Sequence, residues 1–374
     1  MKALLCNAVG SIDAAVVGEV PEPTLRMREV LVRIHACALN FPDVLMIEGK
    51  YQRRPPLPFT PGCEFSGIVE SVGADANGFN PGDRVRATVA YGALAEKLAV
   101  SVEDLALLPD AVDLDEAAAL LFTYATSLYA LRDRGALAAG NSLLVLGAGG
   151  GVGVAAVELG KALGARVVAA ASSESKLGLA RSKGADLGVR YPLDMRGKPH
   201  QKEFADRLKA AAGGLPSIPL NLPLLKGCQI VGAVWGTATR RDPRLKVRIH
   251  RELIDLLAQG RIRPHIHCRF ELDRARDGLK MLAERRGTDP PIQDLARSGR
   301  TAFCRSVDGG FPSSPQDACS IRRRAPSMSR CAAGPAGDAR IPGTEDSQFR
   351  GDAGCVRTSS GPMNGVLYLP LAWK

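Results

Sequence analysis

The sequence predicts an α/β protein with a β-rich first unit and a second unit in which strands and helices alternate. Short strands separated by turns dominate residues 1–121. A helical connection follows at 113–133, where apolar residues recur every three or four positions. Residues 141–173 then read as strand, glycine turn, helix and strand. With 374 residues, 45% of them hydrophobic, the chain can bury the cores of two domains.

Composition excludes several classes of protein. The apolar run at the start of the chain is too short for a signal-peptide core, and no stretch approaches the roughly 18 apolar residues of a membrane helix. We therefore expect a cytoplasmic protein without a membrane partner. The nine cysteines are scattered and form no CxxC pair, which argues against a disulfide framework or a zinc ribbon.

The net charge of +10 raises the question of an anionic partner. Lysine and arginine are spread along the chain, and no basic stripe is interleaved with aromatic residues. A solvated basic surface explains such a balance, so we do not expect nucleic-acid binding.

The first unit carries three polar candidates between its expected strands. Strands are predicted at 29–39, 67–73 and 82–89, the last after the turn "NPGD". The candidates are Asn40, Asp43 and Tyr51, in or beside predicted loops, where polar residues often line a cleft. The alternative is that Asn40 and Asp43 form turn hydrogen bonds to the backbone and Tyr51 covers a core edge.

The stretch "VLGAGGGVGV" at 145–154 carries the clearest motif of the second unit. Its glycines permit a tight turn and close backbone approach to a dinucleotide pyrophosphate, and a helix beginning near Val152 directs its positive dipole end there. The strand and helix on either side make this prediction much stronger than an isolated glycine motif. The predicted pyrophosphate-binding residues are Gly147, Gly150, Gly151, Val152 and Gly153.

The end of the next strand predicts which dinucleotide binds. An NAD site usually has an acidic residue there, but this chain reads Ala171, Ser172, Ser173, followed by Lys176. Hydroxyls and an ammonium suit a 2′-phosphate, which favours NADPH. The alternative is that residues 172–176 only cap the following helix, with Glu174 as a nearby acid that could serve NAD.

Three ordered stretches make the chain resemble a known family. "LNFPDVLMIEGKYQ" (39–52), "PPLPFTPGCEFSGIVESVG" (55–73) and "GFNPGDRV" (78–85) resemble the zinc-free NADPH:quinone oxidoreductase branch, the zeta-crystallin-like proteins, of the medium-chain dehydrogenase/reductase superfamily. The resemblance implies a GroES-like catalytic domain, a Rossmann-type nucleotide-binding domain, and hydride transfer from NADPH to a quinone or an α,β-unsaturated carbonyl.

The resemblance also implies an absence of zinc. Zinc alcohol dehydrogenases of the superfamily place a Cys and a His where this chain has Asn40 and Cys63, followed by a Glu that matches Glu64. Asn is a poor zinc ligand, and the four closely spaced cysteines of the structural zinc lobe are missing. We therefore expect no metal at either site.

The family assigns roles to further residues. Its 2′-phosphate contacts match Ser172, Lys176 and Tyr191, and its Thr beside the nicotinamide matches Thr126. The alternative for Thr126 is a hydroxyl bonded to a carbonyl of its own helix. The residues expected to border the catalytic cleft are Asn40, which would also contact the cofactor, Asp43, and Tyr51 as proton donor.

The second unit departs from the family after a predicted helix at 201–214. The chain runs directly into 215–236, so two strands and their helix, a unit of roughly 30 residues or more, are missing. Family likeness resumes at 250–266 and 273–287. Loss of these strands would expose the flank of the first half's sheet.

The C-terminal segment also departs from the family. From residue 289 onward, Gly, Pro and Ser supply 29 of 86 residues, and no strand or helix period occurs before 365–373. We therefore predict a disordered tail, and our hypothesis is an internal deletion near residue 214 and a frameshift near 288. The predicted domains are a GroES-like domain at 1–121, a truncated Rossmann-type domain at 122–262, a return to the catalytic domain at 263–288, and the tail at 289–374.

Two functions follow from this organisation. The first is an NADPH-dependent, zinc-free oxidoreductase that forms a homodimer, as relatives do, through the sheet edge where 228–236 would lie. The second is a remnant of such an enzyme that is inactive or binds nucleotide weakly.

Overall fold

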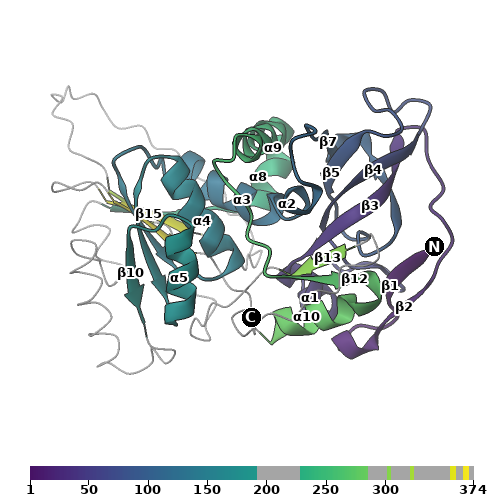
Figure 1. Cartoon of the computed structure of the whole chain (residues 1–374), viewed down its shortest axis with the longest axis horizontal. Coiled ribbons are helices and arrows are strands. Elements are labelled where there is room, and N and C mark those ends of the chain that lie inside the picture. Colours follow the sequence, from purple (N-terminus) through teal and green to yellow (C-terminus); the bar gives the residue numbers. More distant parts are fainter. Residues whose placement is uncertain (192–227, 285–300, 305–320, 324–353, 359–364, 370–374) are drawn as a thin grey trace, which may run out of the picture.

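The computed structural model describes most of the first three-quarters of the chain and four short stretches of the remainder. The described residues are 1–191, 228–284, 301–304, 321–323, 354–358 and 365–369. They form two lobes, one around an antiparallel sheet and one around a largely parallel sheet, with α2, α3, α8 and α9 near their junction (Figure 1). The predicted α/β class, with a GroES-like sheet and a Rossmann-like sheet, is confirmed.

The antiparallel lobe contains the three strands that the sequence predicted, which are β3, β4 and β5, and four further strands. Its strand order is β12-β13-β3-β4-β5-β7, and β6 pairs with β3. Its core contains side chains such as Val32, Phe65 and Val85, all fully or almost fully buried. The strands are β3 (Glu29–Leu39), β4 (Glu64–Val72), β5 (Arg84–Thr88), β6 (Lys97–Ser101), β7 (Leu105–Leu107), β12 (Cys268–Glu271) and β13 (Thr301–Cys304).

One predicted loop of this lobe is a helix. Residues Phe41–Ile47 form α1, and Asp43 lies inside it with no solvent exposure. Asn40 is the N-cap, and its backbone N–H donates to Asp43 Oδ2 at 2.8 Å, a capping-box contact. Pro42 in the first turn favours the same start. The prediction that Asp43 sits in a loop was therefore wrong, because the N-terminal signal of a short helix was overlooked.

The predicted helical connection at 113–133 is divided into three parts. These parts are α2 (Leu114–Ala118), α3 (Leu121–Leu128) and a π-helical turn (Tyr129–Arg134). The second helix begins where Phe122 N donates to Glu64 Oε2 at 2.9 Å. A first-turn N–H has no acceptor within its own helix, so the Glu64 carboxylate stabilises the break.

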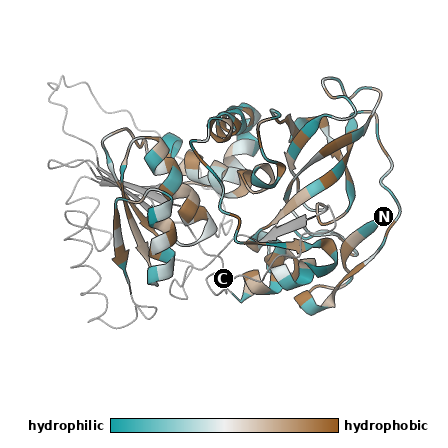
Figure 2. Cartoon of the chain, in the orientation of Figure 1, coloured by the Kyte–Doolittle hydropathy of each residue, from teal (hydrophilic) through white to brown (hydrophobic). Residues whose placement is uncertain are grey.

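The parallel lobe begins with the predicted strand, turn, helix and strand. Strands β8 (Ser142–Leu146), β9 (Arg166–Ala171) and β10 (Leu187–Arg190) pair in parallel. Helices α4 (Gly151–Ala162) and α5 (Glu174–Ser182) pack against them. Hydrophobic colour concentrates on the strands and on the inward faces of these helices (Figure 2).

Segments from the C-terminal part of the chain complete this sheet. The full strand order is β10-β9-β8-β16-β15-β11-β14. Strand β16 runs parallel to β8, while β15 runs antiparallel to both β16 and β11. The strands are β11 (Cys228–Gly232), β14 (Ile321–Arg323), β15 (Gly354–Thr358) and β16 (Gly365–Leu369).

This arrangement changes three expectations. Strand β16 covers the flank of β8 that the sequence predicted to be exposed. Strand β11 is bordered by β15 and β14, so it is not the sheet edge, and the homodimer expected there stays a prediction. Four strands lie within 289–374, including β13 in the antiparallel sheet, and the disordered tail stays a prediction. The predicted helix at 201–214 and both proposed junctions lie outside the described residues.

The other elements frame these two sheets. Helix α9 packs against α3 and α8, and α10 packs against α1 and β13. The bounds are β1 (Lys2–Cys6), β2 (Ala15–Glu19), α8 (Trp235–Arg241), α9 (Pro243–Ala258), α10 (Ala275–Ala283), and the 3-10 turns Ile12–Ala14, Val102–Asp104 and Leu272–Arg274. The stretches 250–266 and 273–287, where the family likeness resumes, overlap α9 and α10.

Candidate cofactor and substrate site

The glycine turn between β8 and α4 has the geometry of a pyrophosphate cradle. Gly147 adopts a φ of +67°, which L side chains rarely adopt, and its carbonyl accepts from Gly150 N at 3.0 Å. Gly150 is the N-cap of α4, which begins at Gly151, close to the predicted position. The free N–H groups and the positive end of the helix dipole therefore meet at this turn.

Two glycines of the turn have no room for a side chain. A Cβ on Gly153 would lie 2.1 Å from Gly147 O, which holds the first turn of α4 against the loop. A Cβ on Gly149 would lie 2.6 Å from the side-chain carbons of Lys176. The turn is thus closed on itself and covered by the Lys176 stem. This tight form fits the close approach that a dinucleotide pyrophosphate needs.

The residues predicted to select the cofactor lie together beside this turn. Lys176 Nζ donates to Ser172 Oγ at 3.1 Å, and both side chains are 7% exposed. Tyr191 is also buried, and its backbone N–H donates to Ala171 O, at the end of β9. Burial raises the pKa of the Tyr191 phenol to about 12. Ser172, Lys176 and Tyr191 thus form one cluster at the carboxyl ends of β9 and β10.

The capping alternative holds for the neighbouring serine. The Ser173 side chain accepts from Lys176 N at 3.4 Å and is the N-cap of α5. Glu174, the acid considered for NAD, forms an ion pair with Arg181. Ser172 and Ser173 therefore have different environments: Ser172 faces the lysine ammonium, whereas Ser173 begins the helix.

A second cluster lies in the antiparallel lobe, where Asn40 contacts two acidic residues. Asn40 Nδ2 donates to Glu64 Oε1 at 2.9 Å and to Ala38 O at 3.3 Å. Asp43 Oδ1 accepts from Gly62 N at 3.2 Å and from Cys63 Sγ at 3.0 Å. The turn hydrogen bonds considered as the alternative for Asn40 and Asp43 are thus present, and the amide of Asn40 additionally fixes Glu64.

The electrostatics of this cluster follow from burial. Loss of solvent raises the pKa of Asp43 to about 6, although its three hydrogen bonds oppose the shift. Burial also raises the pKa of the Cys63 thiol well above its usual range, and Asp43 adds to the effect. Cys63 is therefore a neutral thiol that donates a hydrogen bond. Among the described residues, no group of three or more His, Cys, Asp and Glu side chains is arranged to hold a metal ion.

Helix α3 connects the two clusters. Phe122 N bonds Glu64, and Ser127 Oγ donates to Val152 O in the first turn of α4. Thr126 lies between these contacts and is half-buried, and its hydroxyl donates to Phe122 O at 2.9 Å. The helix-bonded alternative for Thr126 is thus present, on an element that reaches both the antiparallel lobe and the glycine turn.

Tyr51 lies just beyond α1. Its side chain is half-buried and packs against the core of the antiparallel lobe, and its backbone N–H donates to Leu45 O at 3.1 Å. This position fits the alternative in which Tyr51 covers a core edge. Its role as a proton donor stays a prediction.

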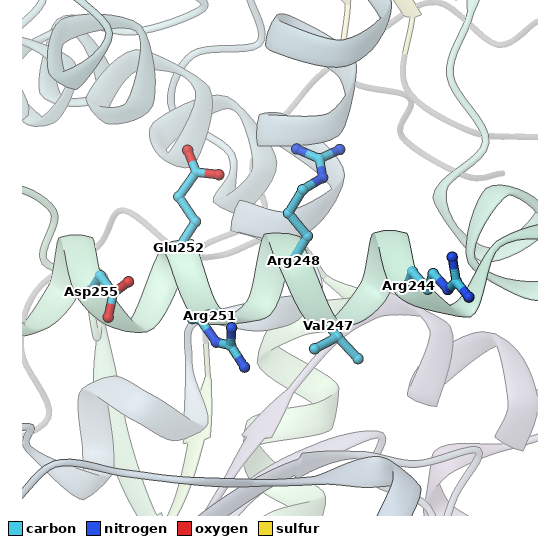
Figure 3. Close-up of a pocket in the computed structure, with 6 residues that line it drawn as sticks. All are labelled: Arg244, Val247, Arg248, Arg251, Glu252 and Asp255. Atoms are coloured by element: carbon cyan, nitrogen blue, oxygen red, sulfur yellow. The ribbon is translucent and has the colours of Figure 1, made fainter.

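A hollow of about 430 Å³ lies elsewhere, along the outer side of α9. Arg248 and Glu252 point to one side of this helix, and Val247 and Arg251 to the other (Figure 3). Arg248 pairs with Asp133, and Glu252 pairs with Arg132. This surface contains none of the predicted site residues. Its lining residues are Arg244, Val247, Arg248, Arg251, Glu252 and Asp255.

Two residues were missed as contributors to the site. Glu64 was considered only as a counterpart of a zinc-site residue, yet it joins Asn40 to α3. Arg86 was not singled out, and its side chain is 1% exposed. The alternation in "RVRATV" indicates that Arg84 and Arg86 point to the same face of a strand. It does not indicate whether this face is covered.

Comparison with known proteins agrees with this geometry. Residues 26–110 match the alcohol dehydrogenase GroES-like domain family. The bovine quinone oxidoreductase-like protein 2 is 33% identical, over 75% of this chain and 89% of its own length. A crystal structure of a probable oxidoreductase from Mycobacterium abscessus is 31% identical, with a TM-score of 0.68, covering 76% of this chain and 96% of that one.

A fold with these two lobes and a glycine-turn cradle defines a medium-chain dehydrogenase/reductase. Within that superfamily, the chain belongs to the quinone oxidoreductase-like branch. The quinone oxidoreductase from Thermus thermophilus, solved also as its complex with NADPH, is 29% identical with a TM-score of 0.59, covering 76% of this chain and 96% of that one.

The bovine alignment bears on the missing strands. It extends over 313 positions, which is more than the 75% of this chain that it covers. The relative therefore contains residues without a counterpart here.

Within the part of the chain that the structure describes, no helix has the length and apolarity needed to cross a bilayer.

Proposed function

We propose that the protein is an NADPH-dependent, zinc-free oxidoreductase that reduces a quinone or the C=C bond of an α,β-unsaturated carbonyl. The observation that carries the proposal is the contact between Lys176 and Ser172 beside the glycine turn. An ammonium and a hydroxyl at the end of β9 attract a 2′-phosphate, whereas NAD sites usually place an acid there.

Different site residues would bind different parts of the cofactor. The turn from Gly147 to Gly153 and the start of α4 would hold the pyrophosphate. Ser172, Lys176 and Tyr191 would hold the 2′-phosphate end. Bound NADPH supplies the hydride, so the task of the chain is to orient the nicotinamide and the acceptor and to exclude water.

Residues of the antiparallel lobe would border the acceptor. Asn40 is held by its hydrogen bond to Glu64 and would lie beside the nicotinamide. Thr126 would approach the nicotinamide from α3. Asp43 holds the loop at Gly62 and Cys63. Tyr51 would donate the proton that accompanies hydride addition, from its phenol to the reduced acceptor. Zinc is not needed because Asn40 occupies the position of a metal ligand and already donates to Glu64.

The alternative, a remnant with weak nucleotide binding, is favoured by a specific observation. The relative has residues without a counterpart here, and the second half of the nucleotide sheet is formed by β15 and β16, of which β15 is antiparallel to β8. A canonical nucleotide sheet would have parallel strands at these positions. An NADPH-oxidation assay with quinones and enones separates the two functions.

Cofactor choice is tested by substitution of Lys176. Fluorescence titration of Lys176→Met should give NADPH binding weaker by roughly 10- to 100-fold and unchanged NADH binding, because a hydrogen bond to a charged group contributes about 1.5–3 kcal/mol. Lys161→Met is the matched control, since Lys161 on α4 pairs with Asp186. Equal loss of NADPH and NADH binding in Lys176→Met would contradict the assignment.

A further inference from the structure

Two arginines on one face of β5 have opposite environments. Arg84 donates to three backbone carbonyls, those of Pro109, Asp110 and Val112, at distances of 2.5–3.0 Å. The guanidinium nitrogens of Arg86 are buried and have no hydrogen-bond partner among the described residues. Side chains two positions apart on a strand point to the same face, so the difference lies in what each one meets there.

The charge of Arg86 is retained despite its burial. Loss of solvent lowers its pKa to about 9, and the Glu64 carboxylate opposes the shift. Arg86 is therefore a cation at neutral pH. Glu64 acts on Arg86 through its charge alone, because no hydrogen bond joins the two side chains among the described residues.

The burial of Arg86 without a partner lowers the stability of the folded protein. A buried cation without a partner is less stable than a solvated one by several kcal/mol, and five N–H donors lack acceptors. Buried charges in folded proteins are usually paired or held for a ligand. The energetics thus point to an anion that this chain does not itself supply from the described residues.

The position of Arg86 is the seam between the two lobes. In the strand register it lies opposite Ser66, whose hydroxyl donates to Leu114 O at the start of α2. The charge of Arg86 also acts on His250 of α9, whose pKa is lowered to about 2 by burial and then by the charges of Arg86 and Lys246. His250 is therefore neutral, and the Lys246 ammonium is paired with Asp104.

Aromatic side chains lie next to His250 at this boundary between the lobes. The rings of His250 and Trp235 lie 6.2 Å apart, and those of Trp235 and Tyr129 lie 5.7 Å apart. Flat apolar surfaces beside a cation suit a planar, conjugated molecule with one anionic end. Glu64 links the seam to Asn40 and thus to the proposed acceptor site.

We propose that Arg86 is a specificity-determining residue that binds the carboxylate of a conjugated acceptor, such as an α,β-unsaturated acid. The inference rests on the proposed function and names its substrate class. The carboxylate accepts from the guanidinium in the seam, where both oxygens can be bonded at once. A neutral enone of the same shape leaves the cation unpaired and binds less tightly.

The test is a thermal-shift measurement on the full chain with NADPH present. Crotonate, an unsaturated carboxylate, should raise the melting temperature by about 2–4 °C, while the neutral isostere crotonamide should not. Inorganic phosphate forms a third arm. Stabilisation by phosphate without stabilisation by crotonate overturns the carboxylate assignment, as does equal stabilisation by crotonate and crotonamide.

Two variants separate binding from folding. Arg86→Met should abolish the crotonate shift and leave the ligand-free melting temperature equal or higher, because it removes an unpaired buried cation. Arg84→Met, the matched control, should lower the melting temperature and keep the shift, since it removes donors from three carbonyls. Persistence of the shift in Arg86→Met overturns the proposal. The comparison of crotonate with crotonamide on the unmodified chain decides it even if that variant does not fold.

Failure of this inference can be told apart from failure of the proposed function. If the unmodified chain binds NADPH but does not respond to crotonate, only the role of Arg86 is wrong. If it does not bind NADPH, the proposed function is wrong.

Discussion

The two sheets of this protein are assembled in different ways. In the antiparallel lobe, the run β3-β4-β5-β7 comes from residues 29–107, and each neighbour is close in the chain. In the other lobe, β8, β9 and β10 are local, but β16 and β15 come from residues 354–369 and separate β8 from β11. In the antiparallel sheet the distant strands β12 and β13 only extend the sheet beyond β3. In the other sheet the distant strands lie between β8 and β11, and their pairing requires closure of a long loop.

The functional groups follow the same division. The Asn40 cluster and Arg86 lie on the local run β3-β4-β5 and on the helices beside it. The glycine turn and Lys176 lie on the local half of the second sheet. The segments that complete the second sheet carry none of the predicted site residues. Their contribution to function is thus to support β8, which ends at the glycine turn.

The largest expected effect comes from removal of β15 and β16. A chain ending at residue 353 loses the partner of β8, and each lost backbone hydrogen bond costs about 1 kcal/mol. We expect loss of the cooperative thermal transition of the nucleotide-binding lobe, measured by calorimetry. Removal of residues 370–374 alone is the control. An unchanged transition in the shorter chain would show that β8 does not need these strands.

A large effect is also expected at the glycine turn. Gly153→Ala places a methyl group 2.1 Å from Gly147 O, and relief of such a clash costs about 1–3 kcal/mol. NADPH affinity, measured by fluorescence titration, should fall by roughly 5- to 150-fold. Gly178→Ala on α5 is the matched control, because nothing lies within 4 Å of its added Cβ. That variant should keep its affinity and gain up to about 1 kcal/mol of stability.

A smaller effect is expected from the pH dependence of the antiparallel lobe. The folded-state pKa of Asp43, about 6, is above its value of 3.8 in an unfolded chain. Folding therefore favours the protonated form, and its contribution, present below pH 3.8, is lost as pH rises to about 6. A shift of this size corresponds to about 3 kcal/mol.

Urea unfolding across this pH range measures the effect. Asp43→Asn should remove this part of the pH dependence, although it lowers stability overall through its lost hydrogen bonds. Asp83→Asn is the control, since Asp83 Oδ2 accepts from Asn80 N in a similar local contact. Equal pH dependence in the unmodified chain and in Asp43→Asn would contradict the assignment.

Sequence patterns predicted the elements that local chemistry determines. Strand alternation located β3, β4 and β5, and the glycine spacing located the start of α4. Ser172 and Lys176 could be paired in advance because both follow β9 directly. The start of α1 could also have been found, from Asn40, Pro42 and Asp43.

The remaining features depend on contacts between distant residues. The pairing of β16 with β8 joins residues more than 200 positions apart. The short period at 365–373 is compatible with a strand there, but nothing in it indicates β8 as the partner. The alternation of the strand places Arg86 on one face of β5, but its burial depends on the elements that cover this face, which the sequence does not reveal. The second partner of Glu64 is the backbone N–H of Phe122, which is available because the chain breaks between α2 and α3.

We propose that the distant strands and the local glycine turn form one cofactor-binding sheet. Hydrogen–deuterium exchange of the full chain, with and without NADPH, tests it most directly. We expect peptides covering 142–146 and 365–369 to be protected together, and NADPH to slow exchange further at 147–153. Exchange of 365–369 at the rate of an unfolded chain, or no response of the glycine turn to NADPH, would contradict the account.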